Sequence, residues 1–530
     1  MAKSLFVLLW VIAILFVTLL YFMNLYFGEL NQDEGWYLYA ARLVHEGNLP
    51  YIHFATTQGP VMSLVYSLTY PLVQKFGLAG GRFFTVLLGF SACLLYALLA
   101  ACLYPSLRRY AAFFSFVLVA VNVYQNYYFT VVKTYSLTAL FLALTFLFFV
   151  LAHKRNDKIL FFLAGICNAI AGCTRSSAAF AVPAVVFYLI VCKSRKDIHN
   201  AFCFFLGFII CSAFLLIPFV LYNPSSLWFA LWEYHTGRRI LSHSSFWAYK
   251  AAFISRQLQA YFTAAAIFVL LVVMFFARLS FRQFEILKTW RLHIDISLWL
   301  AILFISSVHF MAPFPYDDYQ VIVYPLFASA LASAMCKMLV YMQGNEEEKA
   351  GELAKLFSII LLLITIMGSI SSPINQEWFA AKRDRIWWPL KTETPLRKLQ
   401  RVGALVKALT APGDEILTQD PYVVVEADRR IPRGLELGQF SYFPDWSYEK
   451  ASRCHVLNKE MFINLLSKAE FPMAVFSEYG FAIKSPGIIP MSEEESKIFW
   501  QLLEERYYLF REIPDFGQAS TRLRVFLRKN

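Results

Sequence analysis

Charged residues are scarce in this 530-residue sequence: they make up 16% of the chain, against 58% hydrophobic and 18% aromatic residues. An ordinary soluble protein has about a quarter of its residues charged, so the composition excludes that class. Long apolar runs recur through the first two thirds of the chain. This pattern predicts a polytopic membrane protein.

Cysteine pairs and catalytic signature motifs are also lacking. Of the nine cysteines, eight lie in or beside apolar runs and only Cys454 lies in the hydrophilic tail, so no disulfide framework is expected. The histidines show no metal-ligand spacing, and no HExxH, GxSxG, Walker or GxGxxG pattern stands in its usual structural context. These absences argue against a hydrolase and an ATP-driven machine. The lack of an N-x-S/T sequon fits a bacterial protein.

The net charge of +12 does not indicate nucleic acid, because the basic residues lie mostly in short loops between apolar runs, where they set membrane orientation. The hydropathy pattern predicts eleven spans, at 4–26, 81–104, 110–130, 134–152, 159–174, 177–192, 201–222, 258–277, 295–312, 320–341 and 355–372. The first is too long for the apolar part of a cleavable signal. With the N-terminus in the cytoplasm, every inside loop carries Lys or Arg. Residues 27–80, residues 223–257 and the tail then lie outside.

The character of the chain changes near residue 373, where Pro, Gly and charged residues become common. We therefore predict a transmembrane domain over 1–372 and an extracytoplasmic α/β domain over 373–530. In the tail, the patterns predict helices at 394–410 and 493–506, and strands at 415–420, 473–478, 507–513 and 522–529. The expected fold class is a polytopic α-helical membrane protein of about eleven spans with a C-terminal α/β soluble domain.

The stretch NQDEGWYLYAARLVHEG, residues 31–47, places two carboxylates where the chain leaves the first span. The apolar side chains of 34–46 favour a helix lying flat in the membrane interface, and a second such helix is expected over 61–76. Asp33 can be read as the N-cap of the first helix. One cap needs only one carboxylate, however, and Glu34 follows directly. A carboxylate at the membrane face could instead act as a general base for an incoming hydroxyl.

Basic residues at the outer face are candidates for binding phosphate. Lys133 and Arg175 stand at the outer ends of apolar helices with no acid nearby in sequence, and a buried cation needs a partner. A phosphate is the natural one. His235, Arg238 and Arg239, in EYHTGRR, form a second candidate phosphate patch, with an ordinary exposed helix face as the equal alternative.

Other outer-face residues have weaker signals. Arg82, Lys250 and Arg256 are expected to extend their charged ends to the membrane surface. Asp317 and Asp318, in APFPYDDYQ, read as a turn next to two prolines, or as lining of the same cavity as the candidate base. Tyr37 and Gln58 complete the set of residues expected at that cavity.

The motif DEGWYLYAARLVHEGNLPY, followed by TTQGP, resembles the first external loop of the GT-C glycosyltransferases. The similarity is to bacterial relatives of the protein O-mannosyltransferases and of the lipid A aminoarabinose transferase. AGCTRSSAAFAVPA, residues 171–184, resembles a later helix hairpin of the group. Residues 412–445 resemble the tail of some bacterial members.

This resemblance implies interfacial helices in the first external loop and a sugar donor carried on a polyprenyl or dolichyl phosphate. It also implies transfer on the outer face, with the loop carboxylate falling on Asp33 and Glu34 beside it. Many members have a further acid in the second external loop, where this chain, in NVYQNYYFTVVKTYS, has Lys133 instead. A reaction without a metal cofactor is therefore favoured over one that uses a divalent ion.

The resemblance and the residues together predict an inner-membrane glycosyltransferase with a periplasmic tail. Its expected partners are a lipid-phosphate-linked sugar and a glycan, lipid or protein acceptor. A secondary transporter is the main alternative, although such proteins usually carry internal repeats and binding groups near the bilayer midplane. A non-catalytic membrane assembly protein is the other.

Overall fold

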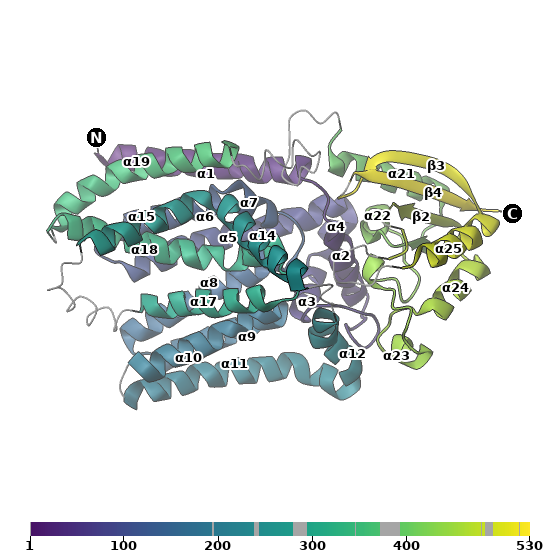
Figure 1. Ribbon diagram of the computed structural model, residues 1–530, viewed down its shortest axis with the longest axis horizontal. Helices are drawn as coiled ribbons and strands as arrows, with labels where there is room; N and C mark the ends of the chain where they lie inside the picture. The colour runs from purple at the N-terminus through teal and green to yellow at the C-terminus, as the bar shows by residue number, and fades with distance from the viewer. Residues whose placement is uncertain are drawn as a thin grey trace.

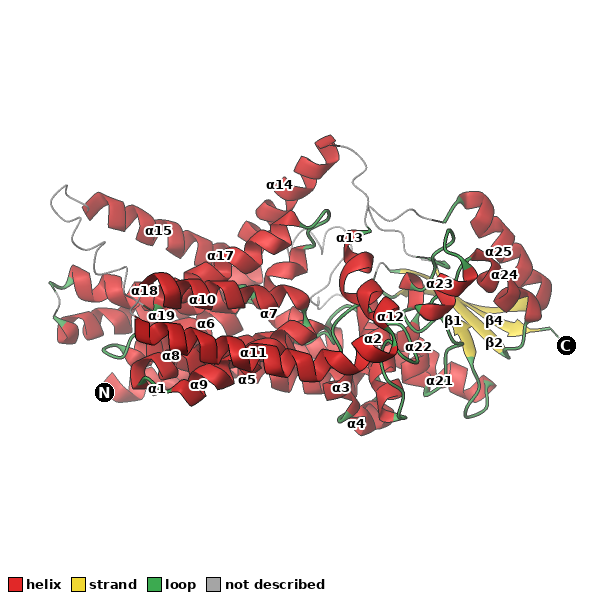
Figure 2. Cartoon of the chain, turned by 90° about the horizontal axis from the view of Figure 1, so that it is seen from below, coloured by secondary structure: helices red, strands yellow, loops and turns green. Residues whose placement is uncertain are grey.

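The structure is a computed structural model that describes residues 2–192, 195–237, 243–278, 294–344, 346–371, 393–478, 480–482, 491–518 and 520–529. A bundle of helices makes up most of the molecule, and a tail that contains all the described strands lies at one end of it (Figures 1 and 2). The α2 helix (Gln32–His45) lies between the two parts (Figure 1).

The bundle consists of helices that follow the predicted spans. They are α1 (Ala2–Phe27), α5 (Leu78–Leu103), α6 (Arg108–Ala120), α7 (Val123–Tyr128), α8 (Thr134–Arg155), α9 (Lys158–Thr174), η1 (Ser176–Phe180), α10 (Ala181–Cys192), α11 (Arg195–Tyr222), α14 (His243–Ala260), α15 (Phe262–Arg278), α17 (Asp295–Met311), η3 (Asp317–Ile322), α18 (Tyr324–Met342) and α19 (Glu347–Ser371). Three short helical turns follow α11 in the chain: α12 (Pro224–Trp228), η2 (Phe229–Glu233) and α13 (Tyr234–Thr236).

The predicted number of eleven membrane spans is not confirmed. Six described helices are long and apolar enough to cross a membrane, and α14 with α15, bent by 92°, could make a seventh. The segments 159–174, 177–192 and 295–312 form apolar helices that are shorter than this. The segment 110–130 is two helices rather than one, because Asn122 accepts a hydrogen bond from the Gln125 amide and starts α7.

The first external loop forms α2 (Gln32–His45), α3 (Val61–Ser67) and α4 (Tyr70–Phe76). The single helix expected over 61–76 is therefore broken. Pro71 stands in the first turn of α4, a position that suits proline at a helix start. The helix expected over 34–46 forms, and its residues 34–42 are all buried, because the bundle and the tail enclose the helix.

The tail follows the predicted pattern closely. Helices α21 (Pro395–Leu409) and α25 (Glu493–Arg506) form where expected, as do β1 (Ile416–Thr418), β2 (Met473–Ser477), β3 (Tyr507–Phe516) and β4 (Thr521–Arg528). The strands make one sheet in the order β1-β2-β4-β3, in which β1 and β2 are parallel and the other pairs are antiparallel. The sequence did not predict α22 (Pro421–Ala427), α23 (Tyr448–Arg453) and α24 (Lys459–Lys468).

The tail and the first external loop share one hydrophobic core. Trp36, Tyr37 and Leu38 of α2 belong to the same buried cluster as the sheet residues. Gly35 of α2 packs so closely on the tail that a Cβ there would collide with the backbone nitrogen of Tyr422. This contact fixes the start of α2 against the tail, and with it the two carboxylates of the motif.

Candidate functional site

The N-terminus of α2 is capped by Asn31 and Glu34, and Asp33 is not the cap. The Asn31 side chain accepts a hydrogen bond from the Asp33 amide, 3.1 Å away, and the Glu34 carboxylate accepts one from the Asn31 amide, 3.0 Å away. This reciprocal pattern is a capping box. The reading of Asp33 as the N-cap was wrong, and its side chain remains available for another role.

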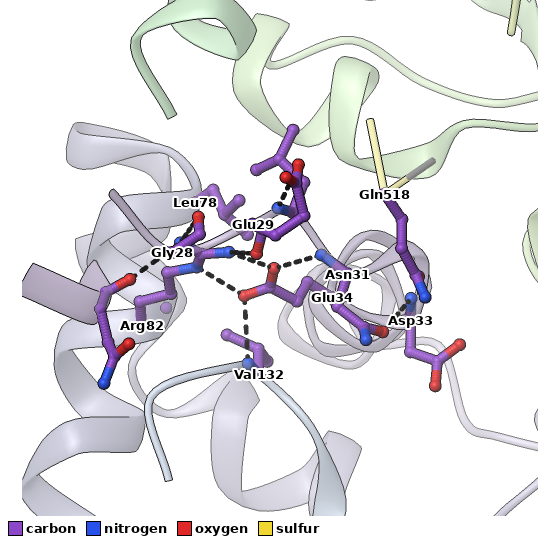
Figure 3. Close-up of polar contacts among 12 residues, drawn as sticks. Gly28, Glu29, Asn31, Asp33, Glu34, Leu78, Arg82, Val132 and Gln518 are labelled. Atoms are coloured by element: carbon purple, nitrogen blue, oxygen red, sulfur yellow. Dashed lines mark hydrogen bonds and ion pairs between the residues drawn. The ribbon is translucent and has the colours of Figure 1, made fainter. Parts of the chain in front are cut away.

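Glu34 and Arg82 form a fully buried ion pair (Figure 3). Arg82 Nε and Nη2 donate to the two oxygens of Glu34 over 2.7 and 2.6 Å. Arg82 Nη2 also donates to the Glu29 carbonyl at the end of α1, and the Val132 amide donates to Glu34. The pair thus joins α1, α2, α5 and the loop before α8. The expectation that Arg82 reaches the membrane surface was wrong.

Lys133 lies between two carboxylates from distant parts of the chain. Its Nζ is 2.9 Å from Asp33 Oδ2 and 2.8 Å from Asp318 Oδ2. The side chains of Lys133 and Asp318 are each 11% exposed, whereas that of Asp33 is 23% exposed. Asp33 Oδ1 also accepts a hydrogen bond from the Trp36 indole, 3.3 Å away. Of the three charged groups, Asp33 is therefore the most open to a ligand.

The charges of this cluster are stabilised by one another. Burial would raise the pKa of Asp318, but Lys133, the Tyr135 hydroxyl and Arg175 together outweigh it and lower that pKa to about 2. Burial would likewise lower the pKa of Lys133, but Asp318 and Asp33 hold it well above its usual value. Lys133 and Asp318 are therefore both charged at neutral pH.

Arg175 lies beside this cluster and is connected to it by aromatic rings. Its guanidinium carbon is 4.8 Å from the ring centroid of Tyr135 and 4.9 Å from that of Tyr319. The Tyr135 ring also faces Lys133 Nζ at 5.4 Å, and its hydroxyl hydrogen-bonds Asp318. The structure thus brings Asp33, Lys133, Arg175 and Asp318 together.

Other predicted residues are placed around this cluster. Tyr37 is buried and interacts electrostatically with Asp33, Lys133 and Arg175. Gln58 is half-buried, and its carbonyl accepts a hydrogen bond from Tyr51 over 2.5 Å. The neighbouring Gly59 packs against the Cys173 carbonyl at the end of α9, so this loop lies near Arg175.

The second candidate phosphate patch is described only in part. His235 Nε2 lies 2.9 Å from the Thr57 carbonyl. Arg238 and Arg239 lie outside the described residues.

The remaining acids and bases form structural contacts. Asp317 pairs with Arg256 at 3.1 Å, and Gln257 donates to its carbonyl. Lys250 is buried and its ammonium donates to the carbonyls of Phe310 and Ala312. The expectation that Lys250 extends to the membrane surface is therefore not met, whereas the Arg256 side chain stays 35% exposed.

Some site residues were not singled out from the sequence. Tyr135 stands two residues after Lys133, and Tyr319 directly follows Asp318; this nearness of aromatic residues to the charged ones was the available signal. No three His, Cys, Asp or Glu side chains suited to holding a metal gather within the described part of the chain. A cavity of about 270 Å³, lined partly by Tyr124, Gln259 and Tyr324, opens where α14 meets α15.

Comparisons with known proteins identify the fold. Residues 57–222 match the family model of dolichyl-phosphate-mannose-protein mannosyltransferases. No curated protein matches the chain by sequence. The crystal structure of ArnT from Cupriavidus metallidurans bound to undecaprenyl phosphate is similar over 99% of this chain and 98% of that one, with 13% identity and a TM-score of 0.60. The apo state of the same protein gives the same values.

An oligosaccharyltransferase from Archaeoglobus fulgidus is a more distant match. Its complex with Zn and sulfate aligns over 94% of this chain and 72% of that one, at 12% identity and a TM-score of 0.49. This similarity is too low to carry an argument. The match to ArnT and the family model confirm the resemblance to GT-C glycosyltransferases at the level of the fold.

Proposed function

We propose that this chain is a membrane glycosyltransferase that moves a sugar from a polyprenyl-phosphate carrier to an acceptor hydroxyl. The observation that carries the proposal is the cluster of Asp33, Lys133, Asp318 and Arg175 at one end of the bundle. A carboxylate next to partly buried cations suits a reaction in which a hydroxyl loses a proton and a phosphate leaves. The ArnT structure, whose bound molecule is undecaprenyl phosphate, supports the donor class.

The reaction we propose is a single inverting displacement. The acceptor oxygen attacks the anomeric carbon and forms the new glycosidic bond, while its proton passes to Asp33. The bond between the anomeric carbon and the phosphate oxygen breaks, and its electron pair leaves with the lipid phosphate. Asp33 suits the role of base because it is the most exposed acid of the cluster. Glu34 holds α2 through Arg82, so we assign it a positioning role.

Lys133 and Arg175 are proposed to stabilise the leaving phosphate. Both are cations within contact of the Tyr135 ring, so one phosphate could approach both. Asp318 keeps Lys133 charged and in place. His235, Arg238 and Arg239 remain a proposed second contact for the donor, and Tyr37, Gln58 and Asp317 a proposed part of the cavity wall.

We propose that this reaction needs no divalent metal. In the described structure the Lys133 ammonium lies between Asp33 and Asp318 and pairs with both carboxylates, in the position that a metal ion bridging two acids would take. The charge-stabilising role is thereby given to a side chain of the protein itself.

The proposed location is a bacterial inner membrane, with the N-terminus in the cytoplasm and the domain from 373 to 530 in the periplasm. The acceptor is a glycan, lipid or protein hydroxyl. The tail packs on α2 beside the site. In that position it could bind the acceptor or cover the reacting groups, which supports placing the tail and the reaction on the same side of the membrane.

A transfer assay tests the proposal. Purified protein in detergent is given radiolabelled sugars on undecaprenyl phosphate, with a bacterial lipid extract as acceptor and EDTA present. We expect label in an acceptor product whose anomeric configuration is inverted. Sealed vesicles that accumulate the labelled sugar without forming any product would indicate a transporter instead. A requirement for Mg²⁺ or Mn²⁺ would contradict the metal-free reaction alone.

A further inference from the structure

His309 of α17 is a buried histidine with one unused ring nitrogen beside the proposed site. The residue is 3% exposed. Its Nε2 lies 2.8 Å from the hydroxyl oxygen of Ser177 in η1. Its Nδ1 is buried and has no hydrogen-bond partner among the residues that the structure describes. A buried polar atom without a hydrogen-bond partner lowers the stability of the folded protein. We therefore expect this nitrogen to bind a ligand.

The side chains of His309 and Arg175 both pack against the Tyr319 ring. The His309 and Tyr319 ring centroids are 5.4 Å apart, and the Arg175 guanidinium carbon lies 4.9 Å from the same tyrosine ring. Arg175 also has an unused buried donor, since its Nε has no partner within the described part of the chain, and its Nη1 donates to Thr134 over 3.3 Å. His309 Nδ1 and Arg175 Nε therefore both lack a partner among the described residues, and both belong to side chains that contact the Tyr319 ring.

The Ser177 contact determines what the unused nitrogen can do. If the serine hydroxyl donates to Nε2, the imidazole carries its proton on Nδ1 and that nitrogen becomes a donor. The nearby guanidinium disfavours a second positive charge on the ring, so the neutral form with a single N–H is expected. Such a donor beside Arg175 suits an anionic oxygen.

We infer that His309, oriented by Ser177, and Arg175 together bind a phosphoryl group. The inference rests on the proposed function for the origin of that group, a polyprenyl phosphate. Arg175 supplies the charge through its guanidinium. His309 supplies one directed hydrogen bond from Nδ1, and Ser177 acts on the ligand only by fixing the tautomer. The ligand's phosphoryl oxygens would then satisfy both nitrogens that the protein leaves unpaired.

Substitutions that mimic one ring nitrogen at a time test this inference. The amide nitrogen of asparagine reaches the position of Nδ1, and that of glutamine the position of Nε2. We expect His309→Gln to weaken binding of undecaprenyl phosphate to the purified protein about tenfold, the value of one hydrogen bond to a charged group. His309→Asn should stay within about threefold of the wild type, and Ser177→Ala should lie between them.

The control is His199→Asn, an exposed histidine near the start of α11, which should bind as the wild type does. Thermal unfolding of each variant identifies any that fails to fold, and only folded variants are compared. Equal binding by the folded His309→Gln and wild-type proteins would overturn the inference.

Inorganic phosphate as a second probe separates this inference from the proposed function. If the wild type binds undecaprenyl phosphate and His309→Gln does so equally well, the inference fails and the donor class stands. If the wild type binds only inorganic phosphate, and His309→Gln loses that binding, the anion site stands and the lipid donor does not.

Discussion

At the scale of single residues, three acids near one another have three different environments. Glu34 is fully buried and bound on both oxygens by Arg82. Asp318 is held by Lys133 and Tyr135, which lowers its pKa to about 2. Asp33 shares Lys133 but keeps the largest exposed fraction. These surroundings leave only Asp33 open to accept a proton from a substrate.

The Glu34–Arg82 pair should be essential for stability. Arg82→Met leaves the Glu34 carboxylate buried without a partner, which we expect to cost about 3–5 kcal/mol. Adding Glu34→Gln should recover a large part of this loss, because no uncompensated charge then remains. The free energy of unfolding, measured with denaturant on purified protein, tests both statements.

An exposed ion pair provides the matched control. Arg401 and Glu393 lie 2.9 Å apart with the arginine 68% exposed, so Arg401→Met should cost at most about 1 kcal/mol. Equal losses for Arg82→Met and Arg401→Met would show that the buried pair has no special role.

At the scale of elements, α2 determines where the site forms. The capping box fixes its first turn, Arg82 holds it to the bundle, and the tail packs on Gly35. The carboxylate of Asp33 is thereby held between parts of the chain that are far apart in sequence.

Local patterns predicted the elements, because helix and strand periodicity is a property of neighbouring residues. The eleven apolar segments are all helical, and the four tail strands lie where expected. Patterns could not pair elements across the chain. Lys133 and Asp318 are separated by 185 positions, and Arg82 and Glu34 by 48, so each lacked an evident partner in the sequence. The same limit applies to the sheet order.

Substitution of Gly35 should disturb the contact between α2 and the tail. In Gly35→Ala the new methyl group collides with the Tyr422 and Pro421 backbone, which cannot move as a side chain could. We expect a loss of about 1–3 kcal/mol in stability and slower sugar transfer, since Asp33 is two residues away. Thermal unfolding and the transfer assay measure the two effects.

Gly351→Ala is the control for this substitution. Gly351 lies inside α19, where the nearest atom to an added Cβ is 4.0 Å away, so alanine should be neutral or slightly stabilising. A Gly35→Ala protein as stable and active as Gly351→Ala would contradict the importance of the contact.

At the scale of the whole molecule, the site lies where the bundle meets the tail (Figure 1). The Lys and Arg residues in the loops predict that the opposite end of the bundle lies in the cytoplasm. The tail and the cluster around Asp33 should then face the periplasm together, at the depth where the phosphate of a membrane lipid lies.

Labelling from one side of the membrane tests this orientation. In a variant with all nine native cysteines replaced, Asn464→Cys on α24 should react with an impermeant maleimide added to spheroplasts. Ser106→Cys, exposed between α5 and α6, should react only after the membrane is permeabilised. The reverse pattern would place the tail in the cytoplasm and contradict a periplasmic reaction.

The most direct test of the central claim is the rate of sugar transfer by Asp33→Asn. The amide cannot take up the acceptor's proton, so we predict a loss of at least about a hundredfold with unchanged expression and thermal stability. The control, Asp157→Asn, caps α9 at the other end of the bundle, where asparagine caps as well as aspartate, and should transfer at the wild-type rate. Transfer by Asp33→Asn at the wild-type rate would contradict the assignment of Asp33 as the base.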